Sequence, residues 1–577
     1  MVSFRRRYYA VVVLFCVFVF SMSVAVSLNV DFGGLRVSYV SIPHDNLRLS
    51  GLLYRPVGVS SENRAPAVVL AHGISSAKES MSGIAVELAR KGFVALALDL
   101  VGHGNSEGRL EDGNADASLG VLAAIEFLEA QPFVRASAIG LVGHSLGAGA
   151  IRAAAVKHAN VLACVFVGGG LGGMVEKPDY GVLNLTFPRN LLVAIGRYDV
   201  LFDLTQVISK DLVLVFGSSG TVVPGVVYGN FSVHTARKLI VPGTTHLFEP
   251  LDPSVVSECV GWMGEALRGE APVLAAGAYV GFVYVYREVA ILIGLAALIG
   301  CLLVLSLVFV DFFQIGACKK GVEPGHGVLT DRWVFVVWCV GGLLLFFPFL
   351  FVGFLVPFPP LIFGGPIAWS LLVVGVLGSV FLRFLAPRFS SVRLRLNAFF
   401  AGSFRLEGLT VAVCLLGMLF LAAYVLERFF VIDLRIFVPV FGVFEPWSRL
   451  LMFFVFVPFF FVYFLVDGLF LHGVRTGEYE KGGVWRTFCG LGKVVVMKVV
   501  PYLLVIVFQY VPFVVFGVPL LGGFAGLLVE FLWLFVPIFV ISTVCSWWFY
   551  RYTGTVGLGV MFNTLIFAWM AAVVFPF

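Results

Sequence analysis

The stretch Gly143-His144-Ser145-Leu146-Gly147 has the pattern G-x-S-x-G and directly follows the apolar run at residues 138–142. A helix-like run at residues 148–158 comes next. A short buried strand, a tight turn and a helix together form a nucleophile elbow, which exposes a serine hydroxyl. Glycines suit this turn because its crowded backbone leaves no room for Cβ atoms beside the serine. Ser145 is therefore a candidate nucleophile.

An acidic residue and a histidine follow later strands in an order that supports this interpretation. After the apolar run at residues 161–167, a second run at 191–195 leads to Asp199, and a third at 238–241 leads to His246. Residues that follow the carboxyl ends of parallel strands gather at one edge of the sheet. We therefore predict that His246 is the general base and then acid for Ser145, while Asp199 orients the imidazole. The alternatives are a turn aspartate and a loop or helix-capping histidine.

The order serine, acid, histidine is that of the α/β-hydrolases, and a second motif also resembles theirs. The residues that match the D-x-x-G-H-G-x-S stretch of this superfamily are Asp99, Gly102, His103, Gly104 and Ser106. The resemblance covers residues 35–268, and it is strongest to esterases, dienelactone hydrolases and serine-aminopeptidase-like members. It implies an α/β-hydrolase fold, with a mostly parallel sheet and helices on both faces.

The resemblance also implies an oxyanion hole. The apolar run at residues 67–71 ends in His72-Gly73, where this fold places one donor, so we expect the backbone N–H of Ile74, or alternatively of Gly73, to serve. The second donor would be the N–H of Leu146, the residue after the nucleophile. His72 and His103 are expected to hydrogen-bond loops and not to act in catalysis.

Two departures from the superfamily concern the parts that select substrates. The segment at residues 168–190 is short, so we expect no large helical cap there. The segment between Asp199 and His246 is long and carries an apolar stretch at residues 221–233. We expect substrate selection to lie in this insertion.

Composition divides the chain into a polar first half and an apolar second half. Of the 577 residues, 60% are hydrophobic and 13% are charged, whereas soluble domains carry about a quarter charged residues. The sequence predicts an N-terminal transmembrane anchor at residues 1–28, an α/β-hydrolase domain at 29–270 and an all-α transmembrane bundle of eight helices at 285–577. A membrane helix needs about 20 apolar residues. The nine candidate spans are residues 9–28, 289–310, 333–356, 361–384, 409–426, 450–466, 497–517, 522–547 and 556–575.

The apolar stretch at residues 429–444 is expected to be interfacial or re-entrant, because Asp433 and Arg435 interrupt it. A tenth span remains the alternative there. The first helix is expected to stay attached as an anchor, with a cleaved secretory signal as the alternative.

Lysine and arginine placement predicts the orientation, since short cytoplasmic loops are rich in these residues. Arg5, Arg6 and Arg7 precede the first span and should stay in the cytoplasm. With nine spans, the basic clusters near residues 319–332, 388–405 and 475–493 also fall on the cytoplasmic side. The α/β domain and the C-terminus should then face outward from the cell membrane.

The remaining signals argue against several classes of site. The nine cysteines lie mostly in or near predicted spans, and Cys164 and Cys259 are expected to be buried thiols. No spacing indicates a metal site, a dinucleotide fingerprint or a phosphate loop, so no cofactor and no metal are expected. The net charge of +5 is explained by the cytoplasmic loops, and no nucleic acid partner follows from it. The oligomeric state is left open.

Polar residues inside apolar spans mark candidate functional positions, because a charge in hydrocarbon is costly. Glu530, Gln509 and Asn563 lie within predicted spans. Glu530 is interpreted either as a hydrogen-bonding group inside the bundle, or as a residue near the interface if the span begins later. The alternative is a part of a polar pathway or a contact with a substrate headgroup. Asp467 and Arg383 lie near predicted helix ends and are expected to extend toward the interface.

The sequence thus predicts a membrane-anchored serine hydrolase that forms an acyl-enzyme with an ester or lipid-type acyl substrate, with membrane lipids as its surroundings. The preference for such substrates rests on the location of the site beside a bilayer. A peptidase or a thioesterase would use the same triad. The second hypothesis is a transporter or scaffold whose hydrolase fold only binds a ligand.

Overall fold

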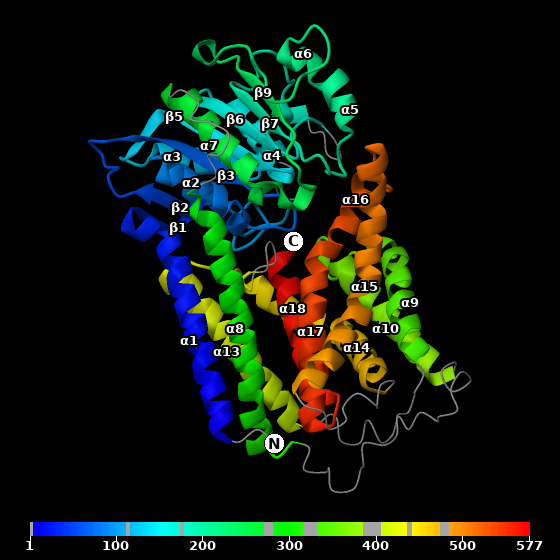
Figure 1. The fold of residues 1–577 in the computed structure, drawn as a ribbon. Helices are drawn as coiled ribbons and strands as arrows, with labels where there is room; N and C mark the ends of the chain where they lie inside the picture. Colours follow the sequence, from blue (N-terminus) through cyan, green and yellow to red (C-terminus); the bar gives the residue numbers. More distant parts are fainter. Residues whose placement is uncertain are drawn as a thin grey trace.

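The chain folds into an α/β domain that sits on one end of a bundle of long helices (Figure 1). The computed structural model describes residues 4–110, 116–172, 178–269, 281–315, 332–384, 406–435, 441–473 and 484–577. Helix α1 (Phe4–Asn29) leads into the α/β domain, and helix α8 (Val283–Phe312) leads out of it into the rest of the bundle. These two helices run side by side (Figure 1).

The α/β domain is built on one sheet whose described part has nine strands, in the order β1-β2-β4-β3-β5-β6-β7-β9-β8. The central strands pair in parallel from β4 to β9, whereas β1, β2 and β8 pair antiparallel at the edges. Central strands such as β3 are apolar along their whole length because both faces are covered. The strands are β1 (Leu35–His44), β2 (Leu47–Pro56), β3 (Ala65–Ala71), β4 (Val94–Leu98), β5 (Val134–His144), β6 (Val161–Val167), β7 (Leu191–Ala194), β8 (Val227–Tyr228) and β9 (Arg237–Ile240).

Helices cover both faces of this sheet. Helices α3 (Val121–Glu129) and α4 (Leu146–Lys157) pack into the apolar cluster on one face. Helices α2 (Ser82–Arg90) and α7 (Pro253–Arg268) pack into the cluster on the other. The prediction of a mostly parallel sheet with helices on both faces is therefore confirmed. The insertion after β7 forms the short helices α5 (Leu204–Gln206) and α6 (Val213–Phe216).

The described part of the chain has nine helical segments that are long and apolar enough to cross a membrane, as the sequence predicts. Helices α16 and α17 form one of these segments, with a break at Phe531. The described residues of the 429–444 stretch form no helix after Phe430, which fits the expectation that this stretch is not a regular span. The remaining helices are α9 (Arg332–Gly353), α10 (Gly364–Phe384), α13 (Leu406–Phe430), α14 (Trp447–Gly473), α15 (Val484–Phe516), α16 (Gly523–Glu530), α17 (Leu532–Thr553) and α18 (Gly557–Val574).

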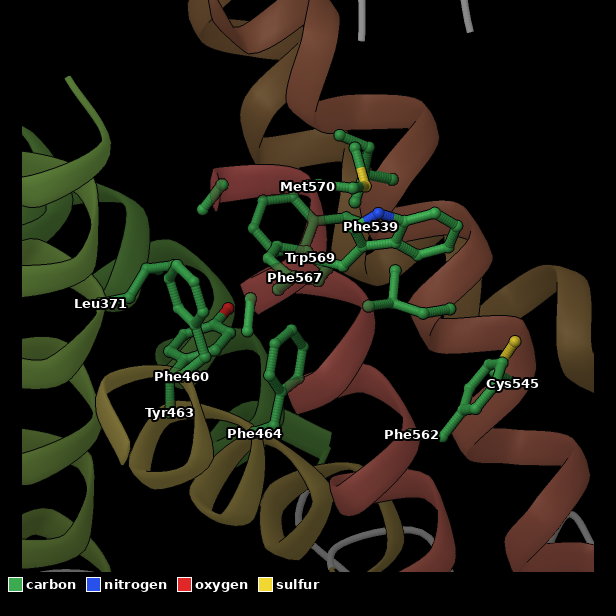
Figure 2. Close-up of a cluster of buried hydrophobic side chains, with 14 of the residues drawn as sticks. Leu371, Phe460, Tyr463, Phe464, Phe539, Cys545, Phe562, Phe567, Trp569 and Met570 are labelled. Atoms are coloured by element: carbon green, nitrogen blue, oxygen red, sulfur yellow. The ribbon is translucent and has the colours of Figure 1, made fainter. Parts of the chain in front are cut away.

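Aromatic side chains fill the interior of the bundle. Figure 2 shows Phe460, Tyr463 and Phe464 of α14 beside Phe567 of α18 and Phe539 of α17. The rings of Phe464 and Phe567 meet edge to face, with centroids 4.6 Å apart. Such pairs add about 0.5–1.5 kcal/mol beyond the area that they bury.

One expectation for the bundle is wrong. Asp467 does not extend to the interface but is buried on α14, where it pairs with Lys498 of α15. Trp338 of α9 donates its indole N–H to the same carboxylate at 2.8 Å. A partner on another helix and an indole donor together make the interior tolerable for this charge, whereas sequence position alone indicated only a helix end.

The α/β domain and the bundle are joined by buried polar contacts. Arg287 of α8 donates to Asn29 and to Ser82, both at 2.8 Å. Arg449 of α14 donates to the carbonyl of Gly102 at 3.0 Å, and the amide of Phe577 donates to the same carbonyl at 3.2 Å. The bundle is therefore docked on the α/β domain by groups that are hydrogen-bonded inside the interface.

Candidate active site

Ser145 sits in a strained turn between β5 and α4. Its backbone has φ 51° and ψ −115°, a conformation that non-glycine residues rarely adopt. A Cβ on Gly143 would come 2.4 Å from the carbonyl oxygen of Gly147, and a Cβ on Gly147 would come 2.3 Å from that of Ala71. The two glycines therefore allow the strand and the helix to approach closely, which fixes Ser145 at the tip of the turn.

The structure brings the three predicted residues together in a line of hydrogen bonds. Nε2 of His246 lies 2.9 Å from Oγ of Ser145, and Nδ1 of His246 lies 2.9 Å from Oδ2 of Asp199. The other carboxylate oxygen of Asp199 accepts from the amide of Leu201 at 2.7 Å. Asp199 and His246 are buried. This is the geometry in which an imidazole can take the serine proton while a carboxylate holds its tautomer.

The comparisons with known proteins agree with this fold. Residues 66–205 match the family model described as the alpha/beta hydrolase fold. The α/β domain has the α/β-hydrolase fold. No protein of curated function matches the chain.

Several solved structures are similar to the hydrolase domain. An esterase from Pyrococcus furiosus is 19% identical, with 41% of this chain and 96% of that chain covered and a TM-score of 0.32. A dienelactone hydrolase from Anabaena variabilis is 19% identical, with 41% and 100% covered and a TM-score of 0.29. A ferulic acid complex of a Butyrivibrio proteoclasticus protein is 18% identical, with 39% and 98% covered and a TM-score of 0.30.

The electrostatics around His246 favour its charged form. Burial lowers the pKa of the imidazole, but the charge and hydrogen bond of Asp199, together with the Glu530 carboxylate, outweigh burial and raise it. The Asp199 and Glu530 carboxylates therefore stabilise the imidazolium that forms when His246 accepts a proton.

Two further buried residues contact the triad, and the sequence analysis assigned them no role. His144 donates from Nε2 to the carbonyl of His246 at 2.9 Å, and burial lowers its pKa well below the usual range. Glu249 accepts from the amide of Gly196 through Oε1 at 2.6 Å, while its Oε2 is buried without a hydrogen bond. Burial and the Asp199 charge raise the pKa of Glu249 well above its usual range. A His-x-x-Glu spacing from His246 was the available signal for Glu249, but spacing alone does not show burial.

His144, His246 and Glu249 together offer three ligand atoms within 4.8 Å of one another. Both ring nitrogens of His246 are already hydrogen-bonded, to Ser145 and to Asp199. The Nε2 atom of His144 donates to the backbone. These donors therefore form a hydrogen-bond network around the imidazole, and we assign no metal to them.

The predicted oxyanion-hole residues lie beside Ser145. Gly73 and Ile74 line the same cavity as the Ser145 side chain, and Leu146 is the first residue of α4, where a backbone N–H has no partner within the helix. Ser75 was not predicted. Its hydroxyl is buried without a hydrogen bond, it lines this cavity, and its φ is 55°.

His72 and His103 behave as the expected loop-binding histidines. Nε2 of His72 accepts from the amide of Leu100 at 3.1 Å, and Nδ1 of His103 lies 3.1 Å from the carbonyl of Val101. Burial lowers the pKa of both rings, so both are neutral.

A small cavity lies beside the Ser145 side chain. Its walls come from the loop after β3, the elbow and the segment that starts at His246 (His246–Leu251). The bundle also contributes to the lining, through Leu527, Phe531 and Leu534. No residue of the insertion at residues 200–245 lines this cavity, and the expectation that the insertion selects the substrate stays a prediction. Sequence patterns do not show which distant helix covers an open site.

The bundle also contacts the two loops that carry Asp199 and His246. The rings of Tyr198 and Phe513 meet edge to face at 6.1 Å, and those of Phe248 and Trp533 at 6.4 Å. Glu530, at the end of α16, accepts a hydrogen bond from Tyr510 of α15, while its second oxygen is buried without one. The interpretation of Glu530 as a hydrogen-bonding group inside the bundle is thus correct for one oxygen, and its charge also reaches His246.

Proposed function

We propose that this chain is a membrane-anchored serine hydrolase that acts on an ester or lipid-type acyl substrate. The observation that carries the proposal is the line Ser145–His246–Asp199, with both hydrogen bonds at 2.9 Å, inside a domain with the α/β-hydrolase fold.

In the proposed reaction, His246 removes the proton of Ser145 as its Oγ bonds to the substrate carbonyl carbon. The N–H groups of Ile74 and Leu146 stabilise the oxyanion, with Gly73 as the alternative donor on the first side. The bond to the leaving oxygen then breaks, and His246 gives its proton to that oxygen. Water, deprotonated by His246, releases the acid and restores Ser145. Asp199 keeps Nε2 of the imidazole directed at the serine throughout.

The nine membrane-length helices among the described residues support anchoring in the cell membrane. The basic residues before α1 and in later loops favour a cytoplasmic N-terminus and an outward-facing hydrolase domain. A single cysteine placed at the exposed residue Ser61, in a background without the exposed Cys16 and Cys489, tests the orientation. A membrane-impermeant maleimide should label it in intact cells, and labelling only after lysis would reverse the orientation.

Labelling with a fluorophosphonate tests the serine chemistry. The full chain in membranes should react, Ser145→Ala and His246→Ala should not, and Ser61→Ala should react like the parent. An unreactive parent that is shown to be folded would favour the alternative of a transporter or scaffold whose hydrolase fold only binds a ligand. Turnover of esters, thioesters and peptides by the reactive protein would then separate an esterase from a thioesterase or peptidase.

A further inference from the structure

The cavity beside Ser145 has one polar end and one apolar side. Its polar lining residues are Ser75, Ser76 and Ser80, which follow β3, together with His144, Ser145 and His246. Leu247, Pro250 and Leu251 of the hydrolase domain, and Leu527, Phe531 and Leu534 of the bundle, form its apolar side. A carbonyl at Ser145 with a hydrocarbon chain attached would match both parts of this lining.

The apolar wall of the bundle is one continuous face. Leu527, Phe531 and Leu534 follow the i, i+4, i+7 spacing that places side chains on one side of a helix. They run from α16 across the break at Phe531 to the first turn of α17, which continues down into the bundle (Figure 1). All three belong to the candidate membrane span Gly523–Thr553.

The apolar interior of the bundle is also continuous with the catalytic loops. Val200 belongs to the same buried cluster as Leu527 and Phe531, and Ile74 and Leu247 pack against that cluster. Apolar packing is therefore continuous from Ile74, Val200 and Leu247 to the membrane-length helices.

We propose that α16 and α17 form the acyl-binding wall of the active site and that the substrate is a long-chain lipid ester, whose hydrocarbon chain enters from the bilayer. The chain would lie between Leu247–Leu251 and the face formed by Leu527, Phe531 and Leu534. This inference rests on the proposed serine hydrolase function and adds the substrate class to it. It also gives the bundle a role in catalysis that a simple anchor lacks.

The test compares p-nitrophenyl acetate, butyrate, hexanoate and octanoate as substrates of the full chain in detergent. If the wall binds the acyl chain, kcat/KM should rise by about fourfold for each added methylene that reaches it. Leu527→Ala and Phe531→Ala should lose roughly tenfold on octanoate and little on acetate. The matched control is Leu520→Ala, because Leu520 is exposed just before α16 and lies outside the cavity.

A further variant keeps the test decisive if Leu527→Ala and Phe531→Ala fail to fold. Leu534→Trp enlarges a side chain that lines the cavity, so it should accept acetate and reject octanoate, and its activity on acetate would itself report a folded site. Equal rates on all four esters, or an equal loss on all of them in the wall variants, would overturn the acyl-binding wall. Fluorophosphonate labelling would persist in that case and keep the serine hydrolase function, whereas loss of labelling in the parent would overturn both.

Entry from the bilayer is tested in lipid nanodiscs that contain a fluorogenic phospholipid ester. The parent should release the fluorophore and Ser145→Ala should not. If the protein hydrolyses soluble octanoate but leaves the embedded lipid intact, the substrate class proposed here is wrong.

Discussion

The amide of Gly523 donates a hydrogen bond to the carbonyl of Val200 at 2.8 Å. Val200 directly follows Asp199, and Gly523 begins α16, so a helix of the bundle holds the loop that carries the acid of the candidate triad. The same helix supplies part of the lining of the cavity beside Ser145. The membrane region and the hydrolase site are therefore in direct contact. We expect substitutions in α16 to change the reactivity of Ser145.

Gly526→Ala should weaken this contact. A Cβ at Gly526 would come 2.4 Å from the carbonyl of Leu521 and 2.9 Å from Cβ of Val200, so α16 must move away from the acid loop. Alanine favours a helix by up to about 1 kcal/mol over glycine, but overpacking costs about 1–3 kcal/mol. We expect a lower unfolding temperature and slower fluorophosphonate labelling. Gly220→Ala is the control, since a Cβ there would meet no atom within 4 Å, and equal behaviour of the two variants would contradict the prediction.

Glu530→Gln should shift the pH dependence of labelling. The pKa of His246 is raised against the effect of burial, by Asp199 and also by the Glu530 carboxylate. Only neutral His246 can accept the serine proton, so the labelling rate falls as the pH drops through this pKa. Removing the Glu530 charge destabilises the imidazolium and lowers the pKa, so the acidic limb of the profile should move to lower pH. Glu126→Gln, at an exposed position, should leave the limb in place. If the acidic limb of the pH profile is the same in Glu530→Gln as in the parent, Glu530 is uncharged when His246 titrates.

Ser75→Ala should lower kcat more than it changes KM. The Ser75 hydroxyl is buried in the cavity wall with no hydrogen bond of its own, next to the expected oxyanion donor Ile74. A donor used only in the transition state lowers kcat and kcat/KM equally when it is removed, and loss of one oxyanion-hole donor costs about 10²–10³ in rate. Steady-state kinetics with a short ester as substrate gives the separate changes in kcat and KM. Unchanged kcat would show that the hydroxyl does not donate to the reacting oxygen.

The sequence predicts those parts of the structure that depend on patterns among residues close together in the chain. Strands β5, β7 and β9 are followed by Ser145, Asp199 and His246, respectively. Because these strands are parallel, their carboxyl ends lie at the same edge of the sheet and bring the three residues together. The nine membrane-length helices that the structure describes follow from apolar length alone. The contact between Val200 and Gly523 joins residues more than half the chain apart, so no local pattern shows it. The ion pair between Lys498 and Asp467 could likewise not be predicted, because ion pairing between two helices depends on how the helices pack against each other.

Glu249→Gln should change the pH dependence of stability. The pKa of Glu249 is raised by burial and by the Asp199 charge, so the folded protein favours the neutral carboxyl. Its stabilising contribution is complete below the pKa of the unfolded chain and is lost as the pH rises through the raised pKa. Glutamine keeps an acceptor for the amide of Gly196 but cannot ionise. The unfolding temperature of Glu249→Gln, relative to the parent, should therefore increase as the pH rises above about 4.3, the ordinary value for glutamate. Parallel curves for the two proteins would contradict this.

Lys498→Met and Asp467→Asn should each destabilise the bundle more than the double variant does. Lys498 and Asp467 form an ion pair between α15 and α14, inside the ring of Trp338, Tyr463 and Phe539 side chains. Removing one partner leaves an uncompensated buried charge and costs about 3–5 kcal/mol, whereas replacing both partners is often close to neutral. Thermal unfolding of the four proteins in one detergent gives the double-mutant cycle, and fluorophosphonate labelling shows whether the site stays intact. Single losses that simply add in the double variant would mean that the two charges are stabilised separately, by Trp338 and Tyr463 and not by each other.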